Sequence, residues 1–192
     1  MRTVVVGNSG SGKTWLSQQL AVKRVVPLIP LDDIFWQPGG FDLRRAPAEV
    51  DDLVSSYLQQ AQWVVEGVFG DLAARFLKVA DELVWLDTPW HLCEARLLAR
   101  GSESKRHMDR EQSHAGLQKL LTWAEAYYAR DGDASHQAHQ FLFSAFGREK
   151  HYLSTGDEIT AYLSRPNRSA NTEPQRHAAA SPQMLRSGCF QR

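Results

Sequence analysis

Short apolar runs alternate with amphipathic stretches along most of the chain, a pattern typical of an α/β protein. Continuous apolar runs at Val4–Val6, Trp63–Val65 and Leu83–Leu86 predict strands buried on both faces of a sheet. A second strand is expected over Val25–Leu31 and a last one over His151–Leu153. Strands separated by helices predict a sandwich built on a mostly parallel sheet, in which ligands bind at the carboxyl ends of the strands.

Helices are predicted where apolar side chains recur at helical spacing. One is expected to begin near Pro47, whose fixed φ suits a first turn, and another at Thr88–Pro89, an N-cap followed by a first-turn proline. Between Arg100 and His114 the chain is polar, which is typical of a mobile flap. The apolar stripes are Val50, Val54, Tyr57 and Ala61, then Leu92, Ala95 and Ala99, then Leu117, Leu120, Leu121, Ala124 and Tyr127.

The 192 residues carry 22 basic and 22 acidic side chains, but this zero balance hides an asymmetry. Residues 164–192 hold five arginines and one glutamate, a charge of +4, which leaves −4 on residues 1–163. The last segment has little apolar content to offset its ordering entropy. We therefore expect one globular domain over 1–163 and a disordered basic tail over 164–192. Zero total charge argues against a uniformly basic nucleic-acid or membrane binder.

Several features predict a cytoplasmic protein. Cys93 and Cys189 are the only cysteines, which fits unpaired thiols in a reducing compartment. An apolar strand begins within two residues of Met1, so no secretory signal is expected. No apolar run approaches the roughly 18 residues of a membrane span.

The segment from Gly7 to Thr14, called here the phosphate loop, matches G-x-x-x-x-G-K-[ST] between a buried strand and a helix. Its glycines let backbone N–H groups converge on phosphate oxygens at a helix N-terminus. Lys13 would bring a positive charge to the terminal phosphates, and the Thr14 hydroxyl would bind Mg²⁺. The residues expected to bind the nucleotide are Gly7, Asn8, Ser9, Gly10, Ser11, Gly12, Lys13 and Thr14.

Guanine-specific N-K-x-D and transporter-type L-S-G-G-Q are absent from the sequence. The seven histidines match no zinc-binding spacing, and His136 and His139 lack a cysteine or acidic partner at ligand spacing. The large aromatic side chains are expected in the core, namely Trp85, Trp90, Trp123 and the cluster from Phe141 to Phe146.

Three carboxylates are candidates for substrate or metal binding. Asp32 and Asp33 are expected at the end of the second strand, where alternation lets one face a cleft and the other point away, and for each the alternative is a solvated turn or an N-cap. Glu66 follows a buried strand, so it needs a partner: a metal, an arginine or a substrate hydroxyl. A functional role is favoured for Glu66 over a structural ion pair. Asp87 is expected to help begin the following helix.

Arginines are the candidates for binding an anionic substrate and the transferred phosphate. Arg75 lies in a nearly apolar helical stretch, so its guanidinium either reaches a cleft or pairs internally. Arg96 and Arg100 share a helix face and repel each other unless an anion or acid lies between them. Further candidates are Arg106, Arg110 and Arg130.

Five segments together resemble the adenylate-kinase-like P-loop proteins often labelled DNA topology modulation proteins, relatives of nucleoside, nucleotide and shikimate kinases. The resemblance covers about residues 2–163. It is carried by G-N-S-G-S-G-K-T at 7–14, L-D-D-I-F-W-Q-P-G at 31–39, W-V-V-E-G at 63–67, A-D-E-L-V-W-L-D at 80–87, and Arg96 with Arg100.

This resemblance implies a three-layer P-loop fold with a five-stranded parallel sheet in the order 2-3-1-4-5. It also implies a helical lid over about residues 100–130. Asp32 would take an acceptor or magnesium role, Trp36 would line the acceptor pocket, and Glu66 and Arg75 would face the acceptor. Arg96 and Arg100 would serve the phosphates. The chain departs from relatives at Val68–Phe69 and in an arginine-poor helix around Ala124.

Motif and resemblance together predict a phosphotransferase that uses ATP and Mg²⁺ and acts on a small-molecule acceptor of the nucleoside or nucleotide type. Neither a nucleic acid nor a membrane is an expected partner, and the protein is expected to be a monomer or homodimer. The alternative is a nucleotide-binding regulator with little or no kinase activity that acts through a partner.

Overall fold

A computed structural model describes residues 1–38, 43–101 and 110–166, with only the backbone at 110–113. One sheet of parallel strands has the order β2-β3-β1-β4-β5. The predicted α/β class and strand order are thereby confirmed. The strands are β1 (Arg2–Gly7), β2 (Leu28–Pro30), β3 (Trp63–Gly67), β4 (Glu82–Leu86) and β5 (Glu149–Leu153).

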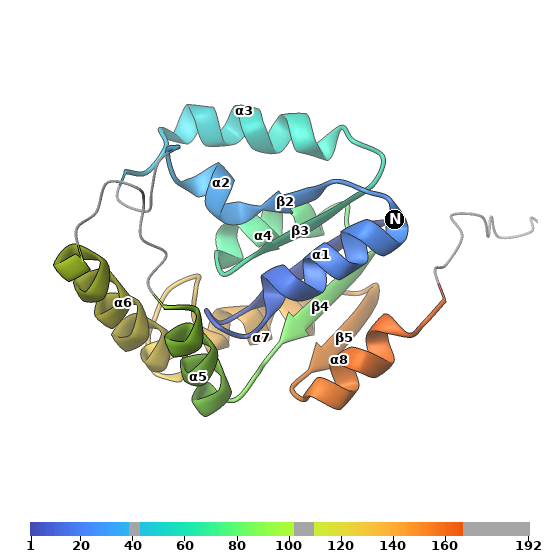
Figure 1. Ribbon diagram of the computed structural model, residues 1–192. Coiled ribbons are helices and arrows are strands. Elements are labelled where there is room, and N and C mark those ends of the chain that lie inside the picture. The colour runs from blue at the N-terminus through green and yellow to red at the C-terminus, as the bar shows by residue number, and fades with distance from the viewer. Residues whose placement is uncertain (39–42, 102–109, 167–192) are drawn as a thin grey trace, which may run out of the picture.

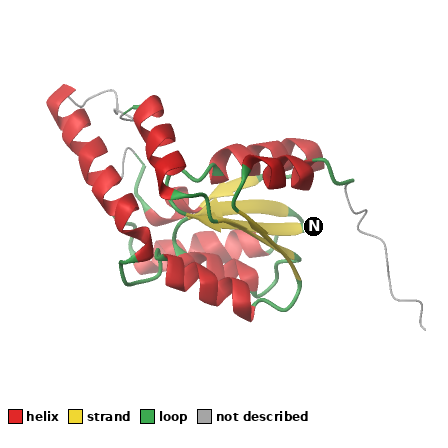
Figure 2. Cartoon of the chain, turned by 90° about the horizontal axis from the view of Figure 1, so that it is seen from below, coloured by secondary structure: helices red, strands yellow, loops and turns green. Residues whose placement is uncertain are grey.

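Helices cover both faces of this sheet, which gives three layers (Figures 1 and 2). On one face the sheet packs against α3, α4 and α7, and on the other against α1 and α8. The helical segments are α1 (Lys13–Arg24), α2 (Leu31–Phe35), α3 (Pro47–Leu58), α4 (Gly70–Leu77), α5 (Trp90–Arg100), α6 (Arg110–Glu125), the 3₁₀ turn η1 (Ala126–Tyr128), α7 (His136–Ala145) and α8 (Gly156–Leu163).

The central strand β1 explains why the sheet needs helices on both sides. Val4 and Val6 point into the core beneath α3 and α4, whereas Val5 points into the core beneath α1 and α8. All three side chains are fully buried, and each stabilises the fold by roughly 1.5–3 kcal/mol. The continuous valine run therefore occupies the middle of the sheet, as its sequence pattern predicts.

The second strand is shorter than predicted and its carboxylates lie elsewhere. Val25 adopts a left-handed conformation, with φ of 55°, and ends α1 instead of beginning β2. Only Leu28–Pro30 pairs with β3, and Pro27, just before this strand, and Pro30, at its end, have no N–H to donate. Asp32 and Asp33 therefore lie in the first turn of α2 and not at the end of a strand.

Two predicted helix and strand boundaries also shift. Pro89, not Thr88, is the N-cap of α5, because the Thr88 hydroxyl donates to the carbonyl of Ser11 in the phosphate loop at 3.0 Å. The last strand begins two residues early, at Glu149. The helix expected after Pro47 is confirmed as α3, with Pro47 as its first residue.

The aromatic residues divide between core and surface. Trp85 is 3% exposed and lies in the core, as predicted. Trp123 and Phe141, in contrast, are 38% and 70% exposed, so the expectation that they lie in the core is wrong. Trp123 packs instead against the guanidinium of Arg130, which lies 3.5 Å from the ring centroid.

The helices α5 and α6 contact each other and project together from the carboxyl edge of the sheet (Figure 2). Helix α5 leads into the segment of about residues 100–130 that is expected to act as a lid, and α6 lies within it. Residues 102–109 of that segment, including Arg106, lie outside the described residues, as does the side chain of Arg110.

The described chain ends just after α8. Ser164 caps this helix, and the Lys23 ammonium donates to the carbonyl of Arg165 at 2.5 Å. Residues 167–192 of the expected tail lie outside the described residues. No helix within the described ranges is both long and apolar enough to cross a membrane.

Candidate functional site

The phosphate loop connects β1 to α1 at the carboxyl edge of the sheet, and its glycines are required by close packing (Figure 1). A Cβ at Gly7 would lie 2.3 Å from the carbonyl oxygen of Leu86, and one at Gly10 would lie 2.5 Å from that of Cys93. Gly10 and Gly12 also have φ values of 78° and 98°. Larger residues would clash with backbone or strain the loop, so the loop lies directly against β4 and α5.

Several N–H groups of this loop are available to a ligand. Within the described part of the chain, no backbone acceptor binds the N–H groups of Gly10, Gly12, Lys13 or Thr14. These groups open α1, whose N-terminus adds a partial positive charge. The loop can therefore accept a multiply charged anion, and its glycine cradle fits phosphate.

The rear of the loop is fixed by side chains from the β4–α5 connection and α5. The Ser11 carbonyl accepts hydrogen bonds from Thr88 at 3.0 Å and from the Arg96 guanidinium at 2.8 Å. Arg96 also donates to the Gly10 carbonyl at 3.3 Å. Because these bonds occupy carbonyls, they do not use the N–H groups of Gly10, Gly12, Lys13 and Thr14.

Lys13 is buried beside the loop, and its Nζ donates to the carbonyl of Asn8 at 2.9 Å. Burial lowers the pKa of Lys13, while the negative charges of Glu66 and Asp32 raise it and offset part of this effect. The charges of two predicted site residues, Asp32 and Glu66, therefore both act on the Lys13 ammonium. This charge arrangement is suited to a phosphate and a divalent cation.

Glu66 lies at the end of β3 and is only 4% exposed. Its Oε1 accepts a 2.9 Å hydrogen bond from the hydroxyl of Thr14, so a buried carboxylate has a hydroxyl partner rather than an arginine. Hydroxyl and carboxylate oxygens are the ligand types that Mg²⁺ prefers. The donor pair formed by Thr14 and Glu66 therefore fits this ion.

Arg96 and Arg100 lie one turn apart on α5, as their spacing predicts. Arg96 contacts the loop directly, and the positive charge of Arg100 acts on Lys13, lowering its pKa. Both arginines are exposed at this edge. Together with Lys13 they bring three positive charges to the surroundings of the phosphate loop.

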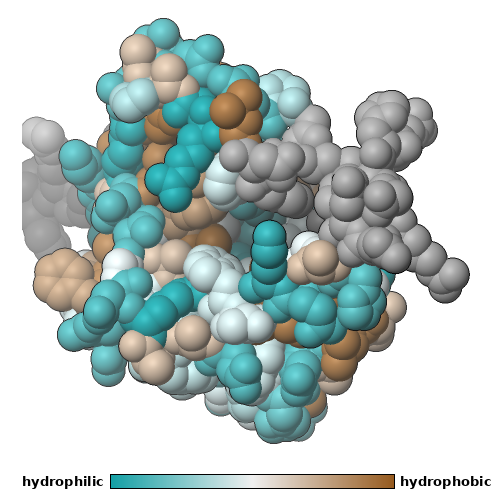
Figure 3. Space-filling view, turned by 90° about the vertical axis from the view of Figure 1, so that its left-hand side faces the viewer, coloured by the Kyte–Doolittle hydropathy of each residue, from teal (hydrophilic) through white to brown (hydrophobic). Residues whose placement is uncertain are grey.

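Aromatic side chains gather near the carboxyl ends of β2 and β3. Phe35 and Phe69 stack with ring centroids 4.1 Å apart, and Trp36 meets Phe35 edge to face at 4.7 Å. Figure 3 shows a hollow with hydrophobic residues on its wall on the side of the molecule that lies at the left of Figure 1. Of the three aromatic residues, the sequence resemblance names only Trp36 for an acceptor pocket, although Phe35 and Phe69 also lie within a few residues of the end of a strand.

Two alternatives are expected for Arg75, a position in a cleft or an ion pair within the protein, and the structure shows the ion pair. Its guanidinium forms a 2.9 Å ion pair with Asp51 of α3. Both side chains are partly exposed, at 32% and 65%, so the pair contributes little to stability.

Asp87 follows β4 and collects hydrogen bonds from three other elements. Its carboxylate accepts from the hydroxyls of Tyr128 at 2.9 Å and Tyr152 at 2.8 Å. Nε2 of His136 lies 3.2 Å from Oδ2 of Asp87. His136 therefore has an acidic partner, although none lies at ligand spacing in the sequence. Burial and the bond to Asp87 raise the pKa of Tyr152 to about 12. The cluster ties η1, β5 and α7 to the end of β4.

A buried chain of hydrogen bonds runs beside this cluster. Nε2 of His139 lies 3.0 Å from the Val68 carbonyl, which can only accept, so Nε2 carries the proton. Nδ1 therefore accepts from Tyr127 at 2.7 Å, and the Tyr127 oxygen accepts from the indole of Trp85 at 3.2 Å. Burial lowers the pKa of His139 to about 4, which keeps this relay neutral.

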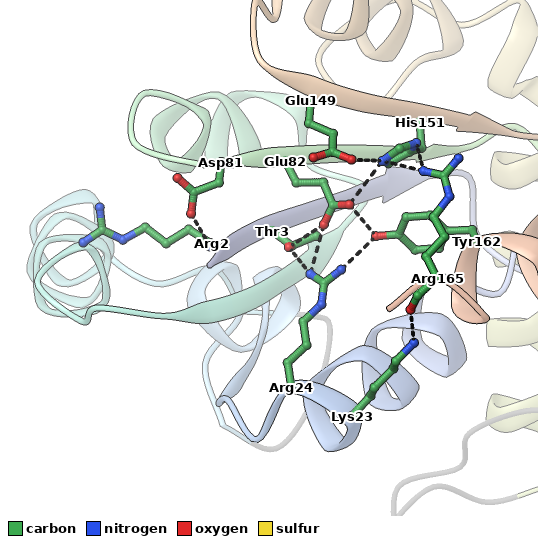
Figure 4. Close-up of polar contacts among 10 residues, drawn as sticks. All are labelled: Arg2, Thr3, Lys23, Arg24, Asp81, Glu82, Glu149, His151, Tyr162 and Arg165. Atoms are coloured by element: carbon green, nitrogen blue, oxygen red, sulfur yellow. Dashed lines mark hydrogen bonds and ion pairs between the residues drawn. The ribbon is translucent and has the colours of Figure 1, made fainter. Parts of the chain in front are cut away.

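A second polar cluster lies at the amino edge of the sheet (Figure 4). Glu82 accepts from Thr3 at 2.8 Å, Arg24 at 2.9 Å and Tyr162 at 2.9 Å, and it lies 3.3 Å from His151. Glu82, His151 and Glu149 have their ligand atoms close enough to hold a metal. Because Arg24 already neutralises Glu82, we interpret this cluster as structural.

Comparisons with known proteins add one likeness. No protein-family model and no curated protein matches the chain. Among solved structures, the chain is similar to the shikimate kinase from Acinetobacter baumannii in complex with shikimate, with 19% sequence identity and a TM-score of 0.40. The likeness covers 73% of this chain and 90% of that one. No activity or substrate is inferred from it.

Proposed function

We propose that this protein is a phosphotransferase that moves the terminal phosphate of ATP to a hydroxyl or phosphate of a small, nucleoside-like or nucleotide-like molecule. The observation that carries this proposal is the grouping of Lys13, Thr14 and Glu66 beside a loop with free N–H groups. Phosphoryl transfer requires positioning and charge stabilisation more than covalent chemistry, and this group supplies both.

The loop N–H groups and Lys13 would hold the phosphates of ATP. Thr14, with the Glu66 carboxylate bonded to it, would hold Mg²⁺, which neutralises phosphate charge when bound. The 2.9 Å contact between Thr14 and Glu66 favours the metal role for Glu66. Asp32 then remains to orient the acceptor hydroxyl and take its proton. Arg96 and Arg100 would stabilise the negative charge that develops during transfer.

The aromatic group of Phe35, Trp36 and Phe69 supports an acceptor that carries a ring. Asp32 and Phe35 lie in α2, which directly follows β2, and Trp36 comes next. Phe69 lies two residues after the end of β3. Aromatic rings offer a nucleobase a stacking surface. Arg75, which an anionic acceptor would need, is already paired with Asp51.

The experiment is to incubate the pure protein with ATP and Mg²⁺ and a panel of nucleosides, nucleoside monophosphates and small hydroxy acids, and to identify phosphorylated products by mass spectrometry. The proposal predicts a phosphorylated member of the nucleoside or nucleotide set. Tight ATP binding with no phosphorylated acceptor would support the nucleotide-binding regulator instead.

A further inference from the structure

Asn8 makes a long-range contact that the phosphate-binding motif does not require. The motif leaves position 8 open, yet this asparagine is 2% exposed and its side chain is fully engaged. Its Nδ2 donates to the carbonyl of Ala124 at 2.8 Å, across 116 positions in the sequence. Its Oδ1 accepts from the N–H of Ser9 at 2.8 Å.

The main chain of the same residue contacts Lys13. The Asn8 carbonyl accepts from the Lys13 ammonium at 2.9 Å and from the N–H of Ser11 at 3.2 Å. A phosphate that binds the loop draws on this same ammonium. If phosphate binding shifts the Asn8 backbone through Lys13, the Asn8 side chain shifts with it, because both belong to one residue.

The partner of Asn8 lies at the end of α6. Ala124 is fully buried in the last turn of this helix, and the next residues, Tyr127 and Tyr128, are bonded to His139 and Asp87. Three hydrogen bonds therefore attach the end of α6 and the turn after it to the domain, and among these three the Asn8 bond is the one that leads to the phosphate loop.

From these contacts we infer that Asn8 is a positioning residue that couples occupancy of the phosphate loop to the placement of α6. The inference rests on the proposed function only in that a nucleotide binds the loop. Coupling is reciprocal, so the bond from Asn8 to Ala124 also strengthens nucleotide binding. The net value of one hydrogen bond corresponds to about two- to tenfold in affinity.

The test is hydrogen–deuterium exchange of residues 117–128, with and without Mg²⁺ and the non-hydrolysable analogue β,γ-imido-ATP. In the wild type, the analogue should change exchange in this segment. Asn8→Asp keeps an acceptor for Ser9 but has no hydrogen for the Ala124 carbonyl. It should bind the analogue about two- to tenfold more weakly, and exchange at 117–128 should not respond to saturating analogue. Asn8→Ser is the second variant and should behave alike.

Tyr128→Phe is the matched control, since it removes a different attachment of the same segment, the bond to Asp87, and should leave the response to the analogue intact. A wild-type response in Asn8→Asp and Asn8→Ser would overturn the inference. A wild type that binds the analogue without any change at 117–128 would also overturn it and leave the proposed function standing. A wild type that does not bind the analogue would overturn both.

Discussion

The hydroxyl of Thr14 donates to Oε1 of Glu66 at 2.9 Å and so joins the first turn of α1 to the end of β3, 52 positions apart. The loop residue and the strand-end carboxylate were each singled out from the sequence, and the structure makes them partners. Glu66 is 4% exposed, and its partner is a hydroxyl, a group that can bind Mg²⁺. Thr14 and Glu66 together would therefore hold Mg²⁺ next to the phosphates.

Replacing Glu66 by glutamine should separate metal binding from nucleotide binding. The amide oxygen can still accept from Thr14, but the negative charge that attracts Mg²⁺ is lost. In the wild type, Mg²⁺ should increase the rise in melting temperature caused by ATP, and in Glu66→Gln this increase should disappear. Glu125→Gln, on the exposed end of α6, should behave as wild type. An undiminished Mg²⁺ effect in Glu66→Gln would remove this residue from the metal site.

Lys13→Ala should abolish stabilisation by nucleotide. Ligand at about 100 times its Kd stabilises a fold by roughly 2.7 kcal/mol, which in a domain of this size raises the melting temperature by about 5–10 °C. Differential scanning fluorimetry with ATP should show this rise in the wild type and in Lys23→Ala, at the far end of α1. If Lys13→Ala retains the rise, ATP binds somewhere other than the phosphate loop.

His139 should make stability fall as the pH drops from 6.5 to 4. Its pKa is about 4 in the folded protein and 6.5 when exposed, so across this range the unfolded chain binds a proton that the folded one does not. The loss amounts to about 3 kcal/mol. Urea unfolding at several pH values should show this slope in the wild type and in His91→Phe, an exposed control.

His139→Phe should lack the slope and, at pH 7, should be less stable by about 1–3 kcal/mol for each polar group left unpaired, on Tyr127 and Val68. The same pH dependence in His139→Phe and wild type would show that another group is responsible.

Glu82 should contribute stability at neutral pH that is lost in acid. Burial alone would raise its pKa, but the hydrogen bond from His151, the charge of Arg24 and the Thr3 hydroxyl outweigh burial and lower it from 4.5 to about 2. The unfolded chain therefore takes up a proton first, and stability falls as the pH drops from 4.5 toward 2.

Glu82→Gln should destabilise the fold by about 3–5 kcal/mol at pH 7, because Arg24 keeps its charge in a largely buried place without a charged partner. Glu149→Gln, whose side chain is 29% exposed, should cost about 1 kcal/mol or less. Both variants should be measured by urea unfolding. Equal losses of stability would show that the cluster does not depend on Glu82 more than on Glu149.

The sheet could be predicted because its inner strands are defined locally. Val4–Val6, Trp63–Val65 and Leu83–Leu86 are continuous apolar runs, and each is buried as predicted. The edge strand β2 could not be placed from the same signal, since prolines and a left-handed Val25 shorten it. A hydrophobic pattern alone does not indicate at which residue the hydrogen bonds between two strands end.

The site divides in the same way. Lys13, Thr14 and Glu66 could be predicted because each lies at a strand end or in a motif with a known chemical purpose. The stacking of Phe35 on Phe69 and the bond from Asn8 to Ala124 join residues that are 34 and 116 positions apart. Such contacts depend on how helices pack, which spacing along the chain does not reveal.

The most direct measurement of the central claim follows the terminal phosphate of ATP. Wild type, Asp32→Asn and the exposed control Asp33→Asn should be incubated with Mg²⁺, γ-labelled ATP and the best acceptor from the panel, and label in acceptor and inorganic phosphate counted separately. The account predicts label in the acceptor for wild type and Asp33→Asn. For Asp32→Asn it predicts transfer that is slower by about 100-fold or more, with near-normal ATP binding. Label that reaches only inorganic phosphate in the wild type would contradict it.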